Sequence, residues 1–471
     1  MRAMGYLFLV LFGLAIGIGL VYFEPYSLWA APTLLFVAFA FVIRPLWLFI
    51  VLLALSTFRL VWQAGGIAPL ELAYSILFLL LIARTLIREG FSADSNDDIK
   101  GFKSPVLLPL CLFLLWAVTS AVVAWLRGHP FAAWTSDLNM IIFYAAYFII
   151  LGNAKTPRET DCLLIALILV TITAVLQSAY EEMTTRSFLT VLYGESVVKF
   201  PVASAFSLNL FLMLLPILLF MRYRRGRWFL FLLICILFGV HQILASVRSR
   251  WLGAIAALMV IFLVAPPLQK TRFLKPVFLL IFCLILLGTL SLTIPSFSRN
   301  PALTFMQMLQ KRFATIFKGR LDPTTEVRFL ESEAAIKEIH KHPWEGSGLG
   351  KEVSYFDTTL YYPQTVSVRY IHNSYLFFLL NMGWVGLALF LWLCGAFTVY
   401  GIRVFRSLKD PYDKGLALGC WAAFIGMLVA GFAGASLNDP ALTIWVGLLM
   451  GIVAILDKRN GVLKEGADAS T

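Results

Sequence analysis

The stretch IHNSYLFFLLNMGWVGLALFLWLCGAFTVY, residues 371–400, decides the fold. It contains no Asp, Glu, Lys or Arg along its whole length. A helix needs about 20 predominantly apolar residues to cross the hydrocarbon core of a bilayer. This stretch therefore predicts a membrane-spanning helix that begins with a polar His-Asn-Ser segment.

Apolar runs of the same kind fill most of the chain. Hydrophobic residues make up 60% of its 471 residues and charged residues 14%, whereas soluble domains carry about 25% charged residues. An ordinary soluble enzyme is thus excluded, and we expect an all-α, polytopic integral membrane protein with about 12–14 transmembrane helices. The candidate spans lie near 5–23, 27–43, 45–60, 67–87, 105–126, 138–151, 162–180, 202–221, 228–246, 251–267, 274–294, 371–400, 416–434 and 441–456.

The distribution of basic residues predicts the orientation of these spans. If the amino terminus is cytoplasmic, 22 of the 38 Lys and Arg residues fall in inside segments and six in short outside loops, while ten lie in segment 295–370. Cytoplasmic loops are enriched in Lys and Arg, and long loops cross the membrane largely regardless of charge. The net charge of +12 is explained in this way without invoking nucleic acid. Both termini are predicted to be cytoplasmic and 295–370 to be periplasmic.

This assignment divides the chain into five regions. We expect an N-terminal transmembrane bundle over 1–247, helices opening with an arginine motif over 248–294, one long helical periplasmic loop over 295–370, C-terminal helices over 371–456 and a cytoplasmic tail over 457–471. Within the loop, Asp322 is a suitable N-cap and Pro323 a suitable first helical residue. Its apolar side is expected to contain Leu330 and Ala334 and the set Phe329, Ile336 and Ile339.

Two arginines interrupt the apolar pattern at the outer face, in Val247-Arg248-Ser249-Arg250-Trp251. A charge at membrane depth is costly, so such residues usually face a cavity or a partner. The alternative is a short turn whose arginines reach lipid headgroups.

Arg328 and His372 are the other candidates for chemistry. Arg328 lies early in the loop helix, where it could either bind phosphate or pair with Glu331 and Ser332 along the helix. His372 stands where the loop re-enters the membrane, and its side chain suits general-base work near neutral pH. His340 and His342 lie two residues apart without accompanying acidic or Cys ligands, so no metal site is predicted. Residues Gly346–Gly350 are interpreted as a turn rather than a phosphate loop.

Three motifs in this order resemble the O-antigen ligase and O-antigen polymerase superfamily of bacterial envelope glycan enzymes. The first is Arg248-Ser249-Arg250-Trp251-Leu252-Gly253. The second is Arg328, an amphipathic helix and His342-Pro343-Trp344-Glu345-Gly346-Ser347-Gly348. The third is His372-Asn373-Ser374-Tyr375-Leu376 followed by Gly383-Trp384-Val385-Gly386. Because either Arg248 or Arg250 could be the arginine of the first motif, both remain candidates.

The resemblance implies transfer of a glycan from an undecaprenyl-pyrophosphate carrier to a sugar hydroxyl at the periplasmic face of a bacterial inner membrane. It implies an inverting reaction without metal or other cofactor. The catalytic residues would be His372 as general base with Arg328, Arg250 and Arg248 as pyrophosphate clamps, and Asn373, Arg320 and Tyr375 would bind substrate. The expected partners are this lipid-linked donor, a sugar acceptor (a lipid-linked repeat unit or lipid A–core), membrane lipid and, among proteins, a chain-length regulator or a flippase, but not nucleic acid.

Four functions remain possible at this point. A polymerase of O-antigen or exopolysaccharide is favoured slightly over a ligase that joins polysaccharide to lipid A–core, and a protein-glycosylating enzyme would use the same donor. A membrane transporter is the leading candidate of another class. It is less favoured because no repeat symmetry is visible and because the candidate residues lie at the outer rim rather than at the midplane.

Overall fold

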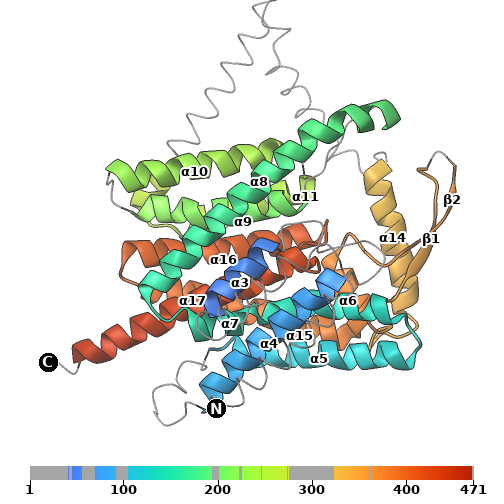
Figure 1. The fold of residues 1–471 in the computed structure, drawn as a ribbon, viewed down its shortest axis with the longest axis horizontal. Helices are drawn as coiled ribbons and strands as arrows, with labels where there is room; N and C mark the ends of the chain where they lie inside the picture. The colour runs from blue at the N-terminus through green and yellow to red at the C-terminus, as the bar shows by residue number, and fades with distance from the viewer. Residues whose placement is uncertain are drawn as a thin grey trace, which may run out of the picture.

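The computed structural model describes residues 41, 45–55, 69–91, 104–193, 201–221, 225–244, 247–272, 274, 323–360 and 362–468. Within these ranges most helices lie side by side along the long axis of the molecule (Figure 1). Helix α14 (Pro323–Ile339) and a small two-stranded sheet instead stand together at one end of the bundle. We call this end, which also carries the candidate site, the α14 end.

Six helical segments of the described residues are long and apolar enough to cross a membrane, which confirms the prediction of an all-α, multi-pass membrane protein. They are α5 (Leu107–Leu126), Phe131–Asn153 (α6, Phe131–Ile142; η3, Phe143–Ala145; α7, Ala146–Asn153), the first part of α8 (Pro157–Tyr193), α15 (Ser374–Ser407), α16 (Pro411–Gly431) and the first part of α17 (Pro440–Asp468). The remaining helices are α3 (Pro45–Leu55), α4 (Pro69–Phe91), α9 (Pro201–Phe220), α10 (Arg225–Leu244) and α11 (Arg248–Val264). The predicted span 5–23 lies outside the described residues, and of the predicted spans 27–43 and 274–294 only residues 41 and 274 are described.

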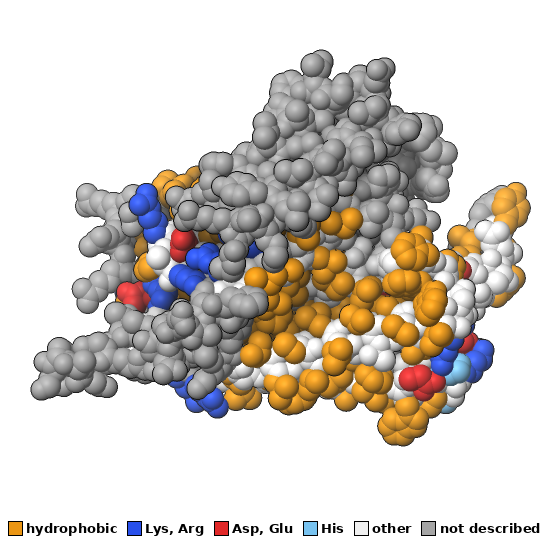
Figure 2. All heavy atoms as spheres, turned by 60° about the horizontal axis from the view of Figure 1, so that its bottom comes forward, with side chains coloured by type: hydrophobic (Ala, Val, Ile, Leu, Met, Phe, Trp, Pro, Cys, Tyr) orange, Lys and Arg blue, Asp and Glu red, His pale blue; other side chains and the backbone are white. Residues whose placement is uncertain are grey.

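The surface of the bundle carries a belt of hydrophobic side chains. Figure 2 shows this belt on one face, with charged side chains gathered at its two ends. Leu115 and Val122 of α5 and Val399 of α15 are among the exposed large hydrophobic residues. Soluble proteins rarely expose apolar surface on this scale, so the belt marks the part of the molecule that faces lipid.

Close packing through small residues of α16 holds this helix against α9 and α11. A Cβ atom on Gly419 of α16 would lie 2.5 Å from the carbonyl oxygen of Met213 in α9, and one on Gly426 would lie 3.0 Å from the carbonyl oxygen of Gly253 in α11. Small residues allow this close approach of helix backbones inside membranes. The first turn of α11, where the arginine motif lies, is therefore fixed by a rigid interface with α16.

Helix α15 is broken at Gly383, whose φ of 66° and ψ of −171° are not helical. The break leaves backbone groups without partners inside the helix, and such groups must be satisfied elsewhere when they are buried. The backbone of the loop after α14 supplies some of these partners. The amide of Trp384 donates to the carbonyl of Pro343 (2.8 Å), and the amide of Val385 donates to that of Trp344 (3.3 Å).

The freed carbonyls on the other side of the break are satisfied in the same way. Leu380 and Asn381 accept from the amides of Ser347 (2.7 Å) and Gly348 (3.1 Å). The Asn381 carbonyl also accepts from the Ser120 hydroxyl at 2.7 Å. The loop is thus built into the helix and fixes where the first segment of α15 points.

A β-hairpin, which the sequence did not predict, follows this loop. Strands β1 (Val353–Asp357) and β2 (Gln364–Val368) pair antiparallel, with Val353 opposite Val368 and Asp357 opposite Gln364. The inward side of β1 packs on α14, and the hairpin projects from the α14 end of the bundle (Figure 1). The loop in which we predicted a helix and a glycine turn therefore also contains a hairpin.

Helix α14 begins at Pro323 as predicted, but its buried side differs from the prediction. The buried residues are Glu331, Ala335 and Ile339, at helical spacing, while Phe329 and Ile336 are 43% and 44% exposed. The prediction is therefore confirmed for Ile339 and wrong for Phe329 and Ile336. The reason is that a carboxylate occupies the packed face of the helix.

Candidate active site

A pocket of about 310 Å³ lies at the α14 end, where four parts of the chain meet. Helix α11, helix α14, the residues just before α15 and the loop after α16 each contribute to its wall. The lining residues are Arg248, Ser249, Leu252, Thr325, Arg328, Phe329, Ser332, His372, Asn373, Phe432 and Ala433. Three of the four residues predicted to be catalytic are thereby brought together from distant parts of the sequence.

The two arginines of the first motif occupy different environments. Val247 is extended and Arg248 begins α11, so Arg248 faces the pocket with the first turn of the helix. Arg250 is only 6% exposed and does not line the pocket. Its charge interacts instead with the Asp439 carboxyl and with Tyr370, whose side chain is partly exposed. The structure therefore separates two residues that the sequence left equivalent.

Asp439 and Tyr370 show the electrostatic effect of this buried arginine. Burial raises the pKa of the Asp439 carboxyl, and the neighbouring Arg250 opposes that rise. Burial of the hydroxyl group and the neighbouring Asp439 raise the pKa of Tyr370 well above its usual value, and Arg250 opposes this rise as well. Because an uncompensated buried charge is costly, Arg250 is suited to holding this region together.

Helix α14 directs Arg328 and Ser332 toward the pocket from successive turns. The Ser332 hydroxyl donates to the backbone carbonyl of Arg328 at 2.7 Å, which closes this turn of the helix. Glu331 points elsewhere: its side chain is 4% exposed and contacts His372. The alternative in which Glu331 pairs with Arg328 along the helix is not the arrangement found.

His372 contacts Glu331 through both its ring and its backbone. The ring Nδ1 lies 2.8 Å from Oε2 and 3.2 Å from Oε1 of Glu331, and the backbone amide of His372 donates to Oε2 at 3.2 Å. The edge-to-face ring of Tyr370 lies 5.3 Å away between centroids. Since Nδ1 is engaged by the carboxylate and His372 lines the pocket, Nε2 is the ring nitrogen left for a substrate.

The predicted substrate-binding residues have different positions. Asn373 lines the pocket and caps α15, its side-chain oxygen accepting from the amides of Tyr375 (3.0 Å) and Leu376 (3.2 Å). Its side-chain NH₂ group is thus the part that can contact a ligand. Tyr375 does not line the pocket; its ring stacks on Phe432 with centroids 4.2 Å apart. Arg320 lies outside the described residues.

The Gly346–Gly350 segment is a turn, as predicted. Gly346, Gly348 and Gly350 all have positive φ, between 77° and 85°. Glycine adopts this conformation without the steric penalty that a side chain would bring. The amide of Gly350 donates to the buried Asp137 carboxylate at 2.8 Å, which ties the end of the turn to α6.

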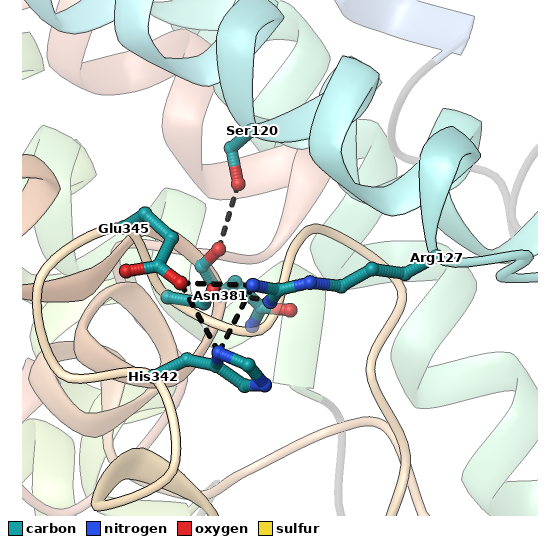
Figure 3. A network of polar contacts seen from close by, with 6 residues as sticks. Ser120, Arg127, His342, Glu345 and Asn381 are labelled. Carbon is teal, nitrogen blue, oxygen red and sulfur yellow. Dashed lines mark hydrogen bonds and ion pairs between the residues drawn. The ribbon is translucent and has the colours of Figure 1, made fainter.

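A polar cluster at the start of the turn joins it to α5 (Figure 3). Arg127, just after the end of α5, donates to the Gly346 carbonyl at 2.6 Å and to Glu345 Oε1 at 2.9 Å. His342 Nδ1 lies 3.0 Å from the Arg127 guanidinium and 3.1 Å from Glu345 Oε1. A hydrogen bond with its own backbone and the bond from Arg127 lower the pKa of Glu345. His342 thus serves the fold of the turn.

Three polar residues of the predicted spans could suggest a transporter: Glu71, Arg84 and His241. The two whose side chains are described contact different parts of the bundle. His241 Nδ1 lies 2.8 Å from the Ser207 hydroxyl between α10 and α9. Arg84 stacks over the ring of Phe41 at 5.7 Å. The side chain of Glu71 lies outside the described residues. His241 is thus a hydrogen-bonded residue of the bundle interior.

Sequence reasoning missed Glu331 and Phe432 as parts of the site. The only local signal for Glu331 is its place three residues after Arg328, and that spacing favours an ion pair along the helix. Phe432 follows the end of α16 and is 62% exposed. Nothing in its local sequence distinguishes it from the other aromatic residues at the ends of spans.

These features define a multi-pass membrane protein with a cationic pocket and a carboxylate-bound histidine at one end of its helical bundle. Residues 208–391 match the family model described as O-antigen ligase. The match includes all three motifs through Gly386 and confirms the resemblance to the O-antigen ligase and polymerase superfamily. No curated protein matches the chain.

Proposed function

We propose that this protein transfers a glycan from an undecaprenyl-pyrophosphate carrier to an acceptor sugar hydroxyl at the periplasmic face of a bacterial inner membrane. The family match supports glycan transfer of the O-antigen ligase or polymerase type. The single observation that carries the finer proposal is the pocket that collects Arg248, Arg328 and His372. In this proposal both chain termini are cytoplasmic.

The two pocket arginines are assigned to the pyrophosphate. Transfer breaks the bond between the anomeric carbon and the pyrophosphate oxygen, and the leaving group takes the electron pair. Fixed positive charge placed where negative charge develops lowers the barrier to such a step. Arg248 from α11 and Arg328 from α14 line the pocket from two helices, and guanidinium groups suit planar recognition of phosphate oxygens.

His372 is assigned as the general base. The Glu331 carboxylate occupies Nδ1, so Nε2 would accept the proton of the acceptor hydroxyl as its oxygen attacks the anomeric carbon. Attack from the side opposite the pyrophosphate inverts that centre. The Asn373 side-chain NH₂ is placed to donate a hydrogen bond to a sugar, because the oxygen of the same side chain already caps α15.

The pocket also offers a route for the lipid. Leu252 lines the pocket and is 41% exposed, and the side of α11 below it exposes Ile255, Met259 and Leu263. A pocket of about 310 Å³ is at the small end of the roughly 300–1,000 Å³ range of ligand sites. We therefore assign only the reacting groups to the pocket, with the isoprenoid chain along α11 in the bilayer and the remaining glycan outside.

The acceptor is proposed to be a lipid-linked repeat unit, which makes the protein a polymerase. The description of the matching family favours a second candidate, a ligase with lipid A–core as acceptor. Both use the same donor chemistry, so the pocket residues have the same roles in either case.

Deletion of the gene tests the proposal. Envelope polysaccharides of the deletion strain are compared by gel electrophoresis after complementation with wild type, His372→Ala or His340→Ala. His340 is the matched control, because its ring Nδ1 contacts a backbone carbonyl of α14 and it does not line the pocket. Wild type and His340→Ala should restore the polysaccharide and His372→Ala should not, at equal abundance in the membrane.

The gel also separates the candidates. Single repeat units on lipid A–core in the deletion strain indicate a polymerase, and bare core with long chains on the carrier indicates a ligase. An unchanged polysaccharide profile, or full restoration by His372→Ala, would overturn the proposal.

A further inference from the structure

The carboxylate of Glu331 is buried in the packed face of α14. Glu331 is 3% exposed and shares this face with Ala335 and Ile339. A buried ionised carboxylate is unfavourable unless hydrogen bonds or a charged partner compensate it. Within the described part of the chain, His372 supplies the hydrogen bonds to its two oxygens. Among the described residues, a single residue thus supplies the hydrogen bonds of a group that is costly to bury.

The geometry of this contact determines which nitrogen of the His372 ring carries the proton and how the ring is oriented. A carboxylate only accepts hydrogen bonds, so an imidazole nitrogen 2.8 Å from Oε2 carries a proton. The neutral ring then has its lone pair on Nε2, which is the form a general base needs. The bond from the His372 backbone amide to the same Oε2 (3.2 Å) restrains the main chain beside the ring.

The position of Glu331 also links the pocket residues of α14 to His372, which lies just before α15. Arg328 and Ser332 face the pocket from α14, while Glu331 on the adjacent side of the same helix contacts His372, two residues before α15. Its charge also reaches the hydroxyl groups of Tyr355 and Tyr370. One helix thus places a phosphate-binding arginine and the partner of the base with a fixed offset.

We propose that Glu331 is a positioning residue that fixes the tautomer and orientation of His372 and stabilises the imidazolium formed during transfer. This inference rests on the proposed role of His372 as general base. A purely structural role, in which Glu331 only joins α14 to the start of α15, predicts a loss of stability but no specific effect on turnover. The two roles differ in what happens once His372 is absent.

The test uses full-length protein in lipid nanodiscs with an undecaprenyl-pyrophosphate-linked glycan as donor. Glu331→Gln keeps the size of the side chain but removes its charge, and Glu331→Asp keeps the charge. We expect Glu331→Gln to lower kcat about 10- to 100-fold and to leave the KM for the donor within about twofold of wild type, because the pyrophosphate is assigned to the arginines. Glu331→Asp should recover part of the loss.

Two controls make the test specific. Glu333→Gln is the matched variant, since Glu333 is exposed on the same helix and pairs with Lys337 one turn away; it should behave as wild type. In the His372→Ala background, adding Glu331→Gln should cause no further loss of kcat. Such non-additivity identifies residues that act as a unit.

The failures of the two proposals are distinguishable. Full kcat in Glu331→Gln together with an inactive His372→Ala overturns the role of Glu331 and leaves the base in place. Normal activity in His372→Ala overturns the proposed mechanism itself. If Glu331→Gln does not accumulate, Glu331→Asp decides the question. Wild-type kcat in that variant, with its carboxylate one methylene shorter, would show that the ring needs no fixed partner and would overturn the inference.

Discussion

The break in α15 predicts that Gly383→Ala is a severe substitution. The native φ of 66° with ψ of −171° lies in a region that is essentially restricted to glycine, and a side chain there costs about 1–3 kcal/mol. The added Cβ would also overlap the carbonyl of Trp344 and lie 2.6 Å from the amide nitrogen of Gly346. These atoms are backbone and cannot rotate away.

Relief of this overlap would disrupt the bonds between loop and helix. The amides of Trp384 and Val385 donate to the loop carbonyls at 2.8 and 3.3 Å, and each such bond contributes about 0.5–1.5 kcal/mol. Together with the backbone term, the expected loss in the free energy of unfolding is about 4 kcal/mol. Since the loop orients the first segment of α15, glycan transfer should fall as well.

Gly395→Ala is the matched control on the same helix. No atom of the described residues lies within 4 Å of a Cβ built at Gly395, so alanine there should increase stability by up to about 1 kcal/mol through its higher helix propensity. Both variants are compared with wild type by thermal unfolding in nanodiscs and by transfer activity. Equal stability of Gly383→Ala and Gly395→Ala would refute the conclusion that glycine is required at the break.

Two further predictions concern charges at the α14 end. Arg248→Ala should reduce transfer about 100-fold with little change in the Tm, because one pocket cation is lost. Arg250→Ala should instead lower the Tm and the abundance, because it removes the buried cation that interacts with the Asp439 carboxyl, and losing one partner of such an interaction costs about 3 kcal/mol. The opposite pattern of effects would contradict these assignments. Burial raises the pKa of the Glu338 carboxyl, but hydrogen bonds from Lys341 and Lys351 outweigh this and hold the pKa below its ordinary value. The resulting stabilisation is present above the ordinary carboxyl pKa and is lost as the pH falls through the lowered one. The free energy of unfolding of wild type should therefore exceed that of Glu338→Gln by about 1 kcal/mol at neutral pH, and the two should be equal in strong acid. Thermal unfolding measured as a function of pH tests this. A difference in stability that does not depend on pH would contradict the prediction.

The local features of the fold could be read from the sequence. Apolar runs located the spans because each span needs a long uncharged stretch, and Pro323 marked the start of α14 because proline suits a first helical turn. The glycines after α14 indicated a turn in the same local way, and the structure gives them positive φ. Each of these features depends on residues that are neighbours in the chain.

Features that depend on distant contacts could not be predicted. Phe329 looked buried by spacing, but the packed face of α14 is set by Glu331 and its contact with His372, 41 residues away. The choice between Arg248 and Arg250 depends on Asp439, which lies near the end of the chain. In both cases the position of a charged residue, Glu331 or Arg250, is determined by a partner that is distant in the sequence. The local sequence pattern does not reveal that partner.

The β-hairpin offers a place to determine which side of the membrane this end occupies. Its strands close on one another through the Ser354 and Ser367 hydroxyls, 2.8 Å apart, and Tyr362 beyond them is 77% exposed. Exposed loop tips tolerate inserted sequence well, so a short epitope after Tyr362 should leave the pocket intact. Antibody labelling of intact spheroplasts would then report the sidedness of the active enzyme itself, without a truncated reporter fusion.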